Sequence, residues 1–303
     1  MKTIIVGLGI QGNKRKKFIK KSEYYASVDN KNKRAEYHSL KKVPTRNYNN
    51  AILCVPDNQK NEQLKYLLKN NKNVMIEKPL KLKKKSDYKL IEKAAKKKKL
   101  HIYTAYNHRF EPHIISIKNI LKKKKIGKIY SCRLFYGNGT SKLVRKSNWK
   151  DKGNGVIDDL CSHLIDICIF WFGIKKIKKF KMISNNKFEN KSIDHAVIVS
   201  NQKNFRIELE ATYCMWKNTF SCDILGSKGS LHIDGLCKWG PSMLKERYRT
   251  FPSGRPKEIV KILKKKDPTW KLEYNFFKKN IKKKSLTNLK NDLKIFSILK
   301  SLR

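Results

Sequence analysis

The stretch "KTIIVGLGIQGN", residues 2–13, decides the fold of the first part of the chain. It opens on "TIIVG", a continuous apolar run typical of a strand that is buried on both faces of a parallel sheet. Gly7, Gly9 and Gly12 follow, between this strand and a basic helical stretch. In a dinucleotide site such glycines permit a tight turn, admit the pyrophosphate to the backbone, and let helix and strand pack closely. The stretch therefore predicts a parallel α/β sheet with a dinucleotide site.

The second apolar run, "YYASVD", ends at Asp29, which follows Gly9 by 20 residues. An acid at about this distance binds the ribose hydroxyls of the adenosine. Asp29 favours NAD over NADP, because a 2′-phosphate would meet a carboxylate, although Lys31, Lys33 and Arg34 nearby weaken that preference. The alternative is a glycine-rich turn with a chance acid.

Strand and helix patterns alternate through the rest of this part. The strands are expected at "AILCVP", "NVMIEKP" and "LHIYTAY", and the helices at "QKNEQLKYLLKNN" and "SDYKLIEKAAKKKK", whose apolar residues have helical spacing. Such alternation predicts a doubly wound parallel sheet, and we assign residues 1–119 to a Rossmann domain that binds NAD(P).

The pattern changes in the second part. After the helix "PHIISIKNILKKKK" come the strand-like "KIYSCRLFYG", a polar loop from Gly137 to Asn154, and the helix "VIDDLCSHLIDICIFWFG". Period-two strands then follow closely: "HAVIVS", "FRIELEATY", "FSCDILG" and "GSLHID". We expect an α+β domain over residues 120–303 with a largely antiparallel sheet. A last helix, "NLKNDLKIFSILKSL", is expected to pack back on the body, because its leucines and phenylalanine share one face.

The charge of the chain is strongly positive. It has 303 residues, 39% hydrophobic, with 72 Lys plus Arg against 24 Asp plus Glu, which gives +48 at pH 7. That suggests a nucleic-acid or anionic-membrane partner. The lysines, however, form short scattered runs, without an aromatic-interleaved stripe, zinc-finger spacing or RNP-like motif. We interpret them as solvated faces and helix ends, and expect no nucleic-acid or membrane partner.

The seven cysteines are odd in number and form no CxxC pair, so neither a disulfide framework nor a structural zinc site is expected. The chain begins with a strand, which leaves no room for a signal peptide. The longest apolar stretch, "LIDICIFWFGI", is too short to cross a bilayer and carries Asp166. These features predict a soluble, cytoplasmic protein. Asp158, Asp166 and the histidines form no convincing metal cluster, so we expect no metal.

Two motifs have residue types suited to catalysis. In "GNGVIDDLCSHLID", Asp159 and His163 are four residues apart and share a helix face beside apolar residues. A histidine oriented by a carboxylate suits a general base for an alcohol, although a satisfied core histidine is the alternative. In "MIEKPL", Lys78 ends a strand pattern, either as surface charge or as an ammonium held for a reaction. "AYNHRF" falls where the pattern changes, so Asn107 and Arg109 could contact substrate. Arg109 could equally pair with a carboxylate.

Together these motifs resemble the Gfo/Idh/MocA family, which includes glucose–fructose oxidoreductase and inositol dehydrogenase. The resemblance rests on "GLGIQG", "EKPL", "YNHRF", "GNGVIDDLCSHLID" and "CDILGSKGSLHID", in this order over nearly the whole chain. It implies that Lys78 is catalytic, beside the reacting carbon, that Glu77 lies near the nicotinamide ribose, and that Pro79 holds the turn, often as a cis peptide. The contacts to NAD expected on this basis are those of Gly7, Gly9, Ile10, Gln11, Gly12, Asp29, Val55, Pro56 and Glu77.

The resemblance also implies roles in the second part. His163 would take the hydroxyl proton, Asp159 would orient its imidazole, and Lys78 would stabilise the alkoxide. Which of Lys78 and His163 accepts the proton varies in the family. Cys161 stands where the family usually has glycine, which could crowd the helix without removing a catalytic group.

The stretches "YGNGTSKLVRKSNWKDKGNGV" and "LCKWGPSMLKERYRTFPSGRP" look like those of family members linked to surface-polysaccharide or sugar metabolism, often acting on nucleotide sugars. Arg145, Trp149, Lys238 and Trp239 would suit such a substrate, unless the tryptophans are core and the cations solvated. We therefore expect an NAD-dependent oxidoreductase acting on the CH–OH group of a sugar or nucleotide sugar, and a homo-oligomer, dimer or tetramer. The alternatives are a dehydrogenase of cyclitols or small hydroxy compounds, and a non-catalytic regulator that senses NAD or sugar.

Overall fold

A computed structural model describes most of the chain and divides it into two compact units. The described residues are 1–147, 151–202, 204–264, 266–282 and 287–302. Unit 1 consists of Met1–Asn107 and Trp270–Phe296, and unit 2 of His108–Thr269 and Ser297–Arg303. The first unit 1 segment ends at Asn107 and a later segment belongs to unit 1 again, whereas the sequence pattern predicts a single boundary at residue 119.

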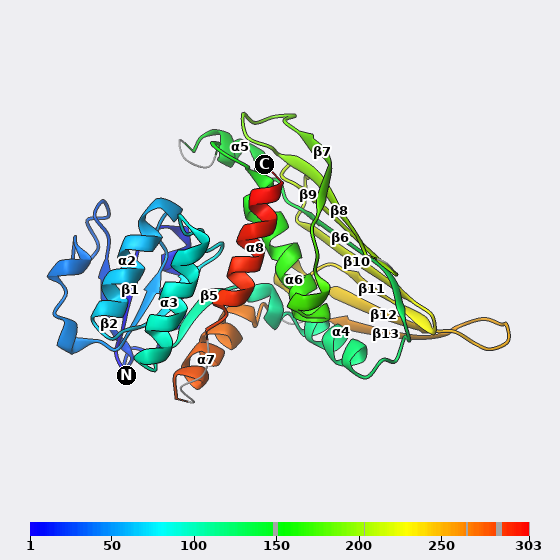
Figure 1. Ribbon diagram of the computed structural model, residues 1–303, viewed down its shortest axis with the longest axis horizontal. Coiled ribbons are helices and arrows are strands. Elements are labelled where there is room, and N and C mark those ends of the chain that lie inside the picture. Colours follow the sequence, from blue (N-terminus) through cyan, green and yellow to red (C-terminus); the bar gives the residue numbers. More distant parts are fainter. Residues whose placement is uncertain (148–150, 203, 265, 283–286, 303) are drawn as a thin grey trace. The chain divides into compact units, whose positions relative to one another are not determined.

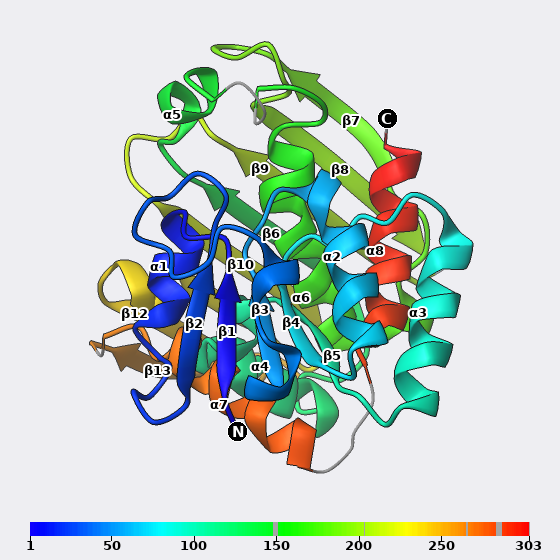
Figure 2. The ribbon, with the colours of Figure 1, turned by 90° about the vertical axis from the view of Figure 1, so that its left-hand side faces the viewer.

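Unit 1 contains a parallel sheet in which the strand order is β2-β1-β3-β4-β5 (Figure 2). Its strands are β1 Thr3–Val6, β2 Tyr24–Val28, β3 Asn50–Leu53, β4 Asn73–Glu77 and β5 Ile102–Ala105. The five apolar runs predicted as strands form this sheet, so the prediction of a parallel α/β sheet is confirmed. Because β1 has β2 on one side and β3 on the other, the chain direction reverses between β1 and β3. Such a switch point opens a crevice at the carboxyl ends of the strands.

Helices surround an apolar core in this unit. They are α1 Ile10–Lys16, α2 Asp57–Lys69, α3 Lys85–Lys97, most of α7 Thr269–Lys282 and the first part of α8 Leu289–Ser301, which passes into unit 2 at Ser297. Short 3-10 turns are η1 Leu40–Lys42 and η2 Thr45–Asn47. In α8, Leu289 is part of the core, and Leu293 and Phe296 pack against it. The Phe296 ring lies 5.4 Å from the ring of Tyr88 in α3. The helical spacing of these apolar residues therefore corresponds to a buried face.

Unit 2 is built on a mixed sheet with the order β13-β12-β11-β10-β6-β9-β8-β7 (Figure 1). Its strands are β6 Ile129–Gly137, β7 Lys181–Asn186, β8 His195–Gln202, β9 Phe205–Thr212, β10 Thr219–Gly226, β11 Gly229–Asp234, β12 Ser242–Tyr248 and β13 Lys257–Leu263. Among the strand pairs of this sheet, β6 and β9 run parallel and the others antiparallel. The prediction of a largely antiparallel sheet is confirmed, although β7, β12 and β13 are not among the predicted strands.

Helices α4 and α6 pack together on one face of this sheet (Figure 1). The helical elements of unit 2 are α4 Pro112–Lys122, α5 Ser141–Arg145, the π-helical turn η4 Ile157–Cys161, α6 Ser162–Phe172, and the 3-10 turns η5 Ile174–Lys176 and η6 Cys237–Trp239. A further 3-10 turn, η3 Asn107–Phe110, begins at the last residue of the first segment of unit 1. The prediction of a polar loop from Gly137 to Asn154 is wrong in part, because this segment contains α5. None of the described helices is long and apolar enough to cross a membrane.

Candidate functional site

The glycine-rich turn after β1 is packed so tightly that two of its glycines have no room for a side chain. Gly7 has φ +94°, and a Cβ there would lie 2.4 Å from the carbonyl oxygen of Cys54. A Cβ on Gly12 would lie 1.8 Å from the carbonyl oxygen of Gly7. Gly9, just before α1, has open space in the direction of a Cβ. The turn therefore presents accessible backbone, followed by the exposed Ile10 and Gln11, which fits the close approach of a dinucleotide.

Asp29 directly follows β2 and is held by backbone groups. Its Oδ2 accepts the N–H of Leu8 at 2.7 Å, and its Oδ1 accepts those of Lys31 at 2.9 Å and Asn32 at 3.0 Å. Burial by itself would raise the pKa of Asp29, but these N–H donors outweigh burial and lower it. Asp29 is thus an ionised acceptor fixed beside the glycine-rich turn.

The remaining residues predicted to contact the cofactor lie at the same edge of the sheet. Val55 and Pro56 connect the end of β3 to α2, and Glu77 is the last residue of β4. In the register of the sheet, Leu53 pairs with Ile76 and with Val6, so these strands end side by side. Within unit 1, the carboxyl ends of β1 to β4 therefore bring together the glycines, Asp29, Val55, Pro56 and Glu77 at the switch point of the sheet. Lys78 follows Glu77, and the peptide between Lys78 and Pro79 is cis.

Glu77 is also part of a buried ionic network. The Arg15 guanidinium of α1 donates through Nε to Glu77 at 2.7 Å and through Nη1 to Glu273 of α7 at 2.6 Å. Tyr103 also donates to Glu273, at 3.1 Å, and the Arg15 guanidinium lies 4.4 Å from the centre of the Trp270 ring. Burial would lower the pKa of Arg15, but the two carboxylates raise it. The network links three elements of unit 1: α1, the end of β4, and α7, which lies in the second segment of this unit.

We expect the buried Glu273 to make the stability of the protein depend on pH. Burial raises the pKa of Glu273 to about 7, although Arg15 opposes the shift. The pKa of an unfolded glutamate is about 4.3. Between about pH 4.3 and pH 7, the folded state therefore retains a proton that the unfolded state has lost. The stabilising contribution is therefore complete below about 4.3 and is lost as the pH rises through about 7, a change on the order of 3 kcal/mol.

We expect Glu273→Gln to remove this dependence. Urea unfolding of the wild type and the variant, followed between acidic and mildly alkaline pH, should show a difference in unfolding free energy that changes over this window. The exposed Glu62 provides the matched control, Glu62→Gln. A wild-type-minus-variant difference that is constant with pH would contradict the assignment.

In unit 2, His163 lies in a buried cluster of rings. It is the second residue of α6, and its imidazole stacks on that of His108 with 4.1 Å between ring centres. The Lys238 ammonium donates to Nε2 of His108 at 2.6 Å. The Tyr136 ring lies 6.1 Å from His163, edge to face, and 5.5 Å from Trp239. His163 therefore belongs to an aromatic cluster that carries a cation at its partly exposed side.

Asp159 lies in the π-helical turn that leads into α6. Its Oδ2 accepts the hydroxyl of the buried Tyr213 at 3.2 Å, and its carbonyl accepts the hydroxyl of Ser162 at 2.8 Å. Burial and Asp159 both raise the pKa of Tyr213, so this phenol stays a donor. Single π-helical turns inside helices are frequent at functional sites. The hydroxyl of Tyr213 thus fixes the carboxylate of Asp159 on the same helical stretch as His163.

The turn that carries Lys238 is anchored by Glu111, the residue before α4. Glu111 accepts the backbone N–H of Cys237 at 3.1 Å and its thiol at 2.9 Å. Burial raises the pKa of Glu111, and burial together with Glu111 raises the pKa of the Cys237 thiol. The anchored turn holds Lys238 and Trp239, with the Lys238 ammonium 4.3 Å from the centre of the Trp239 ring.

The residues predicted to contact substrate have different surroundings. Arg109 donates to both oxygens of the buried Asp166, at 2.7 and 2.5 Å, which is the carboxylate pairing left open by the sequence. Asn107 is buried at the end of a unit 1 segment. The Arg145 side chain is 57% exposed and lies 3.9 Å from Glu189. Trp149 lies outside the described residues.

Several residues of these clusters were not singled out as site residues from the sequence. His108 stands between the two predicted substrate contacts in "YNHRF", so its motif could have identified it. Arg15 and Glu273 are 258 residues apart, and no local pattern predicts their pairing. Tyr213 and Tyr136 lie in ordinary strand patterns, in which an aromatic residue is unremarkable.

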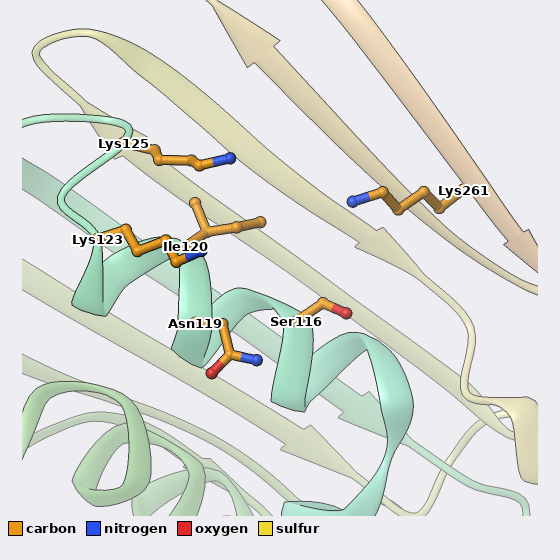
Figure 3. Close-up of a pocket in the computed structure, with 6 residues that line it drawn as sticks. All are labelled: Ser116, Asn119, Ile120, Lys123, Lys125 and Lys261. Carbon is orange, nitrogen blue, oxygen red and sulfur yellow. The ribbon is translucent and has the colours of Figure 1, made fainter.

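A shallow hollow of unit 2 lies away from these clusters. It is lined by Ser116, Asn119, Ile120, Lys123, Lys125 and Lys261, and Lys125 and Lys261 extend into it from opposite sides (Figure 3). Lys261 is also paired with Glu246. The hollow contains none of the candidate residues. In the part of the chain that the structure describes, no group of three or more His, Cys, Asp or Glu is arranged to hold a metal, and the seven cysteines are free.

Two family models match the chain in succession. Residues 1–106 match the model described as an oxidoreductase family with an NAD-binding Rossmann fold. Residues 114–232 match the GFO/IDH/MocA C-terminal domain. The first match contains the glycine-rich turn, Asp29 and Lys78, and the second contains Asp159 and His163.

Curated relatives are also oxidoreductases by name. An uncharacterized oxidoreductase from Schizosaccharomyces pombe is 26% identical over 198 residues, which cover 61% of this chain and 52% of the relative. Oxidoreductase P35 from Formosa agariphila is 27% identical over 168 residues, which cover 53% of this chain and 51% of the relative. The chain thus spans about half the length of the curated relatives it matches.

Solved structures have the same fold. Levoglucosan dehydrogenase in complex with NADH has a TM-score of 0.83 at 15% identity, over 100% of this chain and 95% of that chain. An oxidoreductase from Agrobacterium radiobacter, in complex with NAD+, L-tartaric acid and magnesium, has a TM-score of 0.79 at 15% identity, with the same coverage of 100% and 95%. At this identity the likeness establishes the fold alone.

Proposed function

Since the chain belongs to the Gfo/Idh/MocA family of oxidoreductases, whose amino-terminal domain binds NAD, we propose that it transfers a hydride between NAD and the hydroxyl or keto carbon of a sugar or nucleotide sugar. One observation carries the proposal. The glycine-rich turn, Asp29, Glu77 and Lys78 all lie at the carboxyl edge of the unit 1 sheet, at its switch point. This edge combines a dinucleotide cradle with an ammonium, as hydride transfer at a carbon–oxygen bond requires.

We assign cofactor binding to the accessible backbone at Gly9, with Asp29 as the acceptor for the adenosine ribose. Bound NAD supplies the hydride acceptor. Asp29 is ionised and already fixed by three backbone N–H groups, so it can accept from ribose hydroxyls without reorganising. A 2′-phosphate would meet this charge, which supports NAD over NADP.

Asp29→Asn is expected to weaken NAD binding by about tenfold and to reduce the preference for NAD over NADP. The amide keeps the size of the side chain and one acceptor oxygen but removes the charge. Fluorescence titration with NADH and NADPH measures both dissociation constants, and Asp234→Asn at an exposed position of β11 is the control. An unchanged ratio of the two constants would remove Asp29 from cofactor selection.

The chain's own residues have three roles in the proposed reaction. The Lys78 ammonium stabilises negative charge on the substrate oxygen as it develops. The His163 imidazole takes the proton of the substrate hydroxyl, and Asp159 holds and stabilises the charged imidazole. The sugar substrate is supported by the ring cluster of His163, because Trp239 offers a stacking face beside the Lys238 cation.

A turnover assay with a substrate panel tests the proposed function. The purified protein is incubated with NAD and with free sugars, nucleotide sugars, inositols or small hydroxy acids, and NADH formation is followed by absorbance. Turnover with a sugar or nucleotide sugar supports the proposal, and turnover confined to inositols or small hydroxy compounds would replace the substrate class. Tight NAD binding without turnover in either direction would favour a sensor.

A further inference from the structure

Lys60 of α2 is a buried ammonium that contacts the main chain on either side of Lys78. The side chain is 2% exposed, and its Nζ donates to the carbonyl oxygens of Glu77 at 2.7 Å and Pro79 at 2.9 Å. It also forms an ion pair with Asp57 at 2.7 Å. An ammonium has three N–H donors, and these three acceptors match them. Lys60 therefore holds the main chain on both sides of Lys78.

The two anchored carbonyls limit how Lys78 can move. The Glu77 carbonyl belongs to the planar peptide that enters Lys78, and the Pro79 carbonyl belongs to the planar peptide that leaves the proline. Between them the ring of Pro79 fixes its own φ angle. With both peptides held by one ammonium, the backbone rotations that would redirect the Lys78 side chain are restricted.

Asp57, in the first turn of α2, supplies the negative charge that pairs with Lys60. Asp57 is the first residue of this helix, and its second carboxylate oxygen lies 3.3 Å from the ammonium of Lys81. Asp57 thus compensates the buried charge of Lys60, which would otherwise be costly. Hydrogen bonds from an ammonium are roughly twice as strong as neutral ones. Lysine is therefore a stronger support for the loop than a neutral donor would be.

We propose that Lys60 is a positioning residue, which acts through Lys78 by fixing the backbone that presents the Lys78 ammonium. The inference rests on the proposed function, in which Lys78 stabilises the substrate oxygen. Displacing a reacting group by about 1 Å can lower the rate on the order of 100-fold. The anchoring of Lys78 is thus a requirement of the reaction, beyond the stability of the fold.

Lys72 provides a matched control within the same unit. Its Nζ donates to the carbonyl oxygens of Thr45 at 2.6 Å and Tyr48 at 2.7 Å, and the side chain is 9% exposed. Both lysines donate to two backbone carbonyls, and Lys60 in addition pairs with Asp57. The backbone that Lys72 anchors carries no candidate site residue. Lys60→Met and Lys72→Met therefore remove the same type of interaction at different places.

Kinetics of the two variants separate positioning from stability. With the substrate found in the panel, Lys60→Met is expected to lower kcat by about 10- to 100-fold and to leave KM and the NADH dissociation constant close to wild type. Lys60→Arg, which can still donate to both carbonyls, should restore part of kcat. Lys72→Met should lower the melting temperature and leave kcat unchanged. Equal kcat values for Lys60→Met and Lys72→Met, after correction for folded protein, would overturn the inference.

A double variant and a crystal structure complete the test. Because Lys60 acts through Lys78, Lys60→Met should cause no further loss of kcat in a Lys78→Ala background, and a full additional loss would contradict this. A crystal structure of Lys60→Met needs no substrate and should show Lys78 displaced, whereas an unmoved Lys78 would overturn the inference. Failure of the proposed function has a different signature: the wild type does not turn over, or Lys78→Ala retains wild-type turnover.

Discussion

Replacing Lys78 by methionine is expected to lower kcat by about 100- to 1,000-fold, the loss typical when one donor to a developing oxyanion is removed. Methionine keeps much of the length and the apolar stem of lysine but carries no charge. Negative charge on the substrate oxygen would then develop without its cation. NADH binding should change little, since the glycine-rich turn and Asp29 do not depend on this ammonium.

The kinetic comparison needs a control in a chain with 72 lysines and arginines. The exposed Lys83 lies five residues further along and is not part of the proposed site, so Lys83→Met tests the loss of a nearby positive charge. Steady-state turnover and NADH fluorescence titration are measured for both variants. A Lys78→Met protein that binds NADH and turns over like Lys83→Met would show that Lys78 is ordinary surface charge.

His163→Gln is expected to have the second large effect, a fall in kcat of about 100-fold or more at neutral pH. Glutamine keeps a polar group in the buried ring cluster but cannot accept the proton of an alcohol. Turnover of the variant should rise toward alkaline pH, because hydroxide then takes over proton removal. The pH profile of kcat distinguishes this loss from a simple loss of folded protein.

His113→Gln is the matched control for this prediction. His113 is also buried in unit 2, and its ring contacts the carbonyl oxygen of Ser242 at 3.2 Å. We expect this variant to be less stable but to keep wild-type kcat and pH dependence. Wild-type kcat in His163→Gln at neutral pH would exclude the imidazole as the proton acceptor and leave that role to Lys78 in its neutral amine form.

The parallel sheet could be predicted from the sequence because its signals are local. A strand buried on both faces is apolar throughout, and "TIIVG" is short, rich in β-branched residues and followed by glycines, which favours a strand over a helix. The packing around Gly7 and Gly12 likewise leaves no room for a Cβ, so glycine itself indicates the turn. Strand β13, in contrast, is exposed along nearly its whole length and has no burial pattern to recognise.

The long-range pairs could not be predicted. Helix α7 follows the second sheet in the chain, yet most of it belongs to unit 1, where Glu273 meets Arg15. Amphipathic spacing predicts that such a helix is buried on one face but not against which sheet. The role of Lys60 could not be predicted either, because only the fold distinguishes a buried ammonium from the many solvated lysines.

The residues expected to contact substrate show the same limit. Arg109 had two equally plausible partners, a substrate anion or a carboxylate, and its sequence neighbours could not decide between them. The fold places Asp166 within hydrogen-bond distance, 57 residues further along the chain. Motif residues whose role depends on backbone shape were therefore easier to identify than those whose role depends on a distant partner.

Transfer of deuterium from labelled NADH to a sugar is the most direct test of the proposed chemistry. The wild-type protein is mixed with NADH deuterated at the reactive ring carbon and with a pool of keto sugars and keto nucleotide sugars, and the products are analysed by mass spectrometry. The proposed function predicts one alcohol product that carries deuterium, formed by the wild type and lost in Lys78→Met. NADH binding without deuterium in any product of the pool would contradict it.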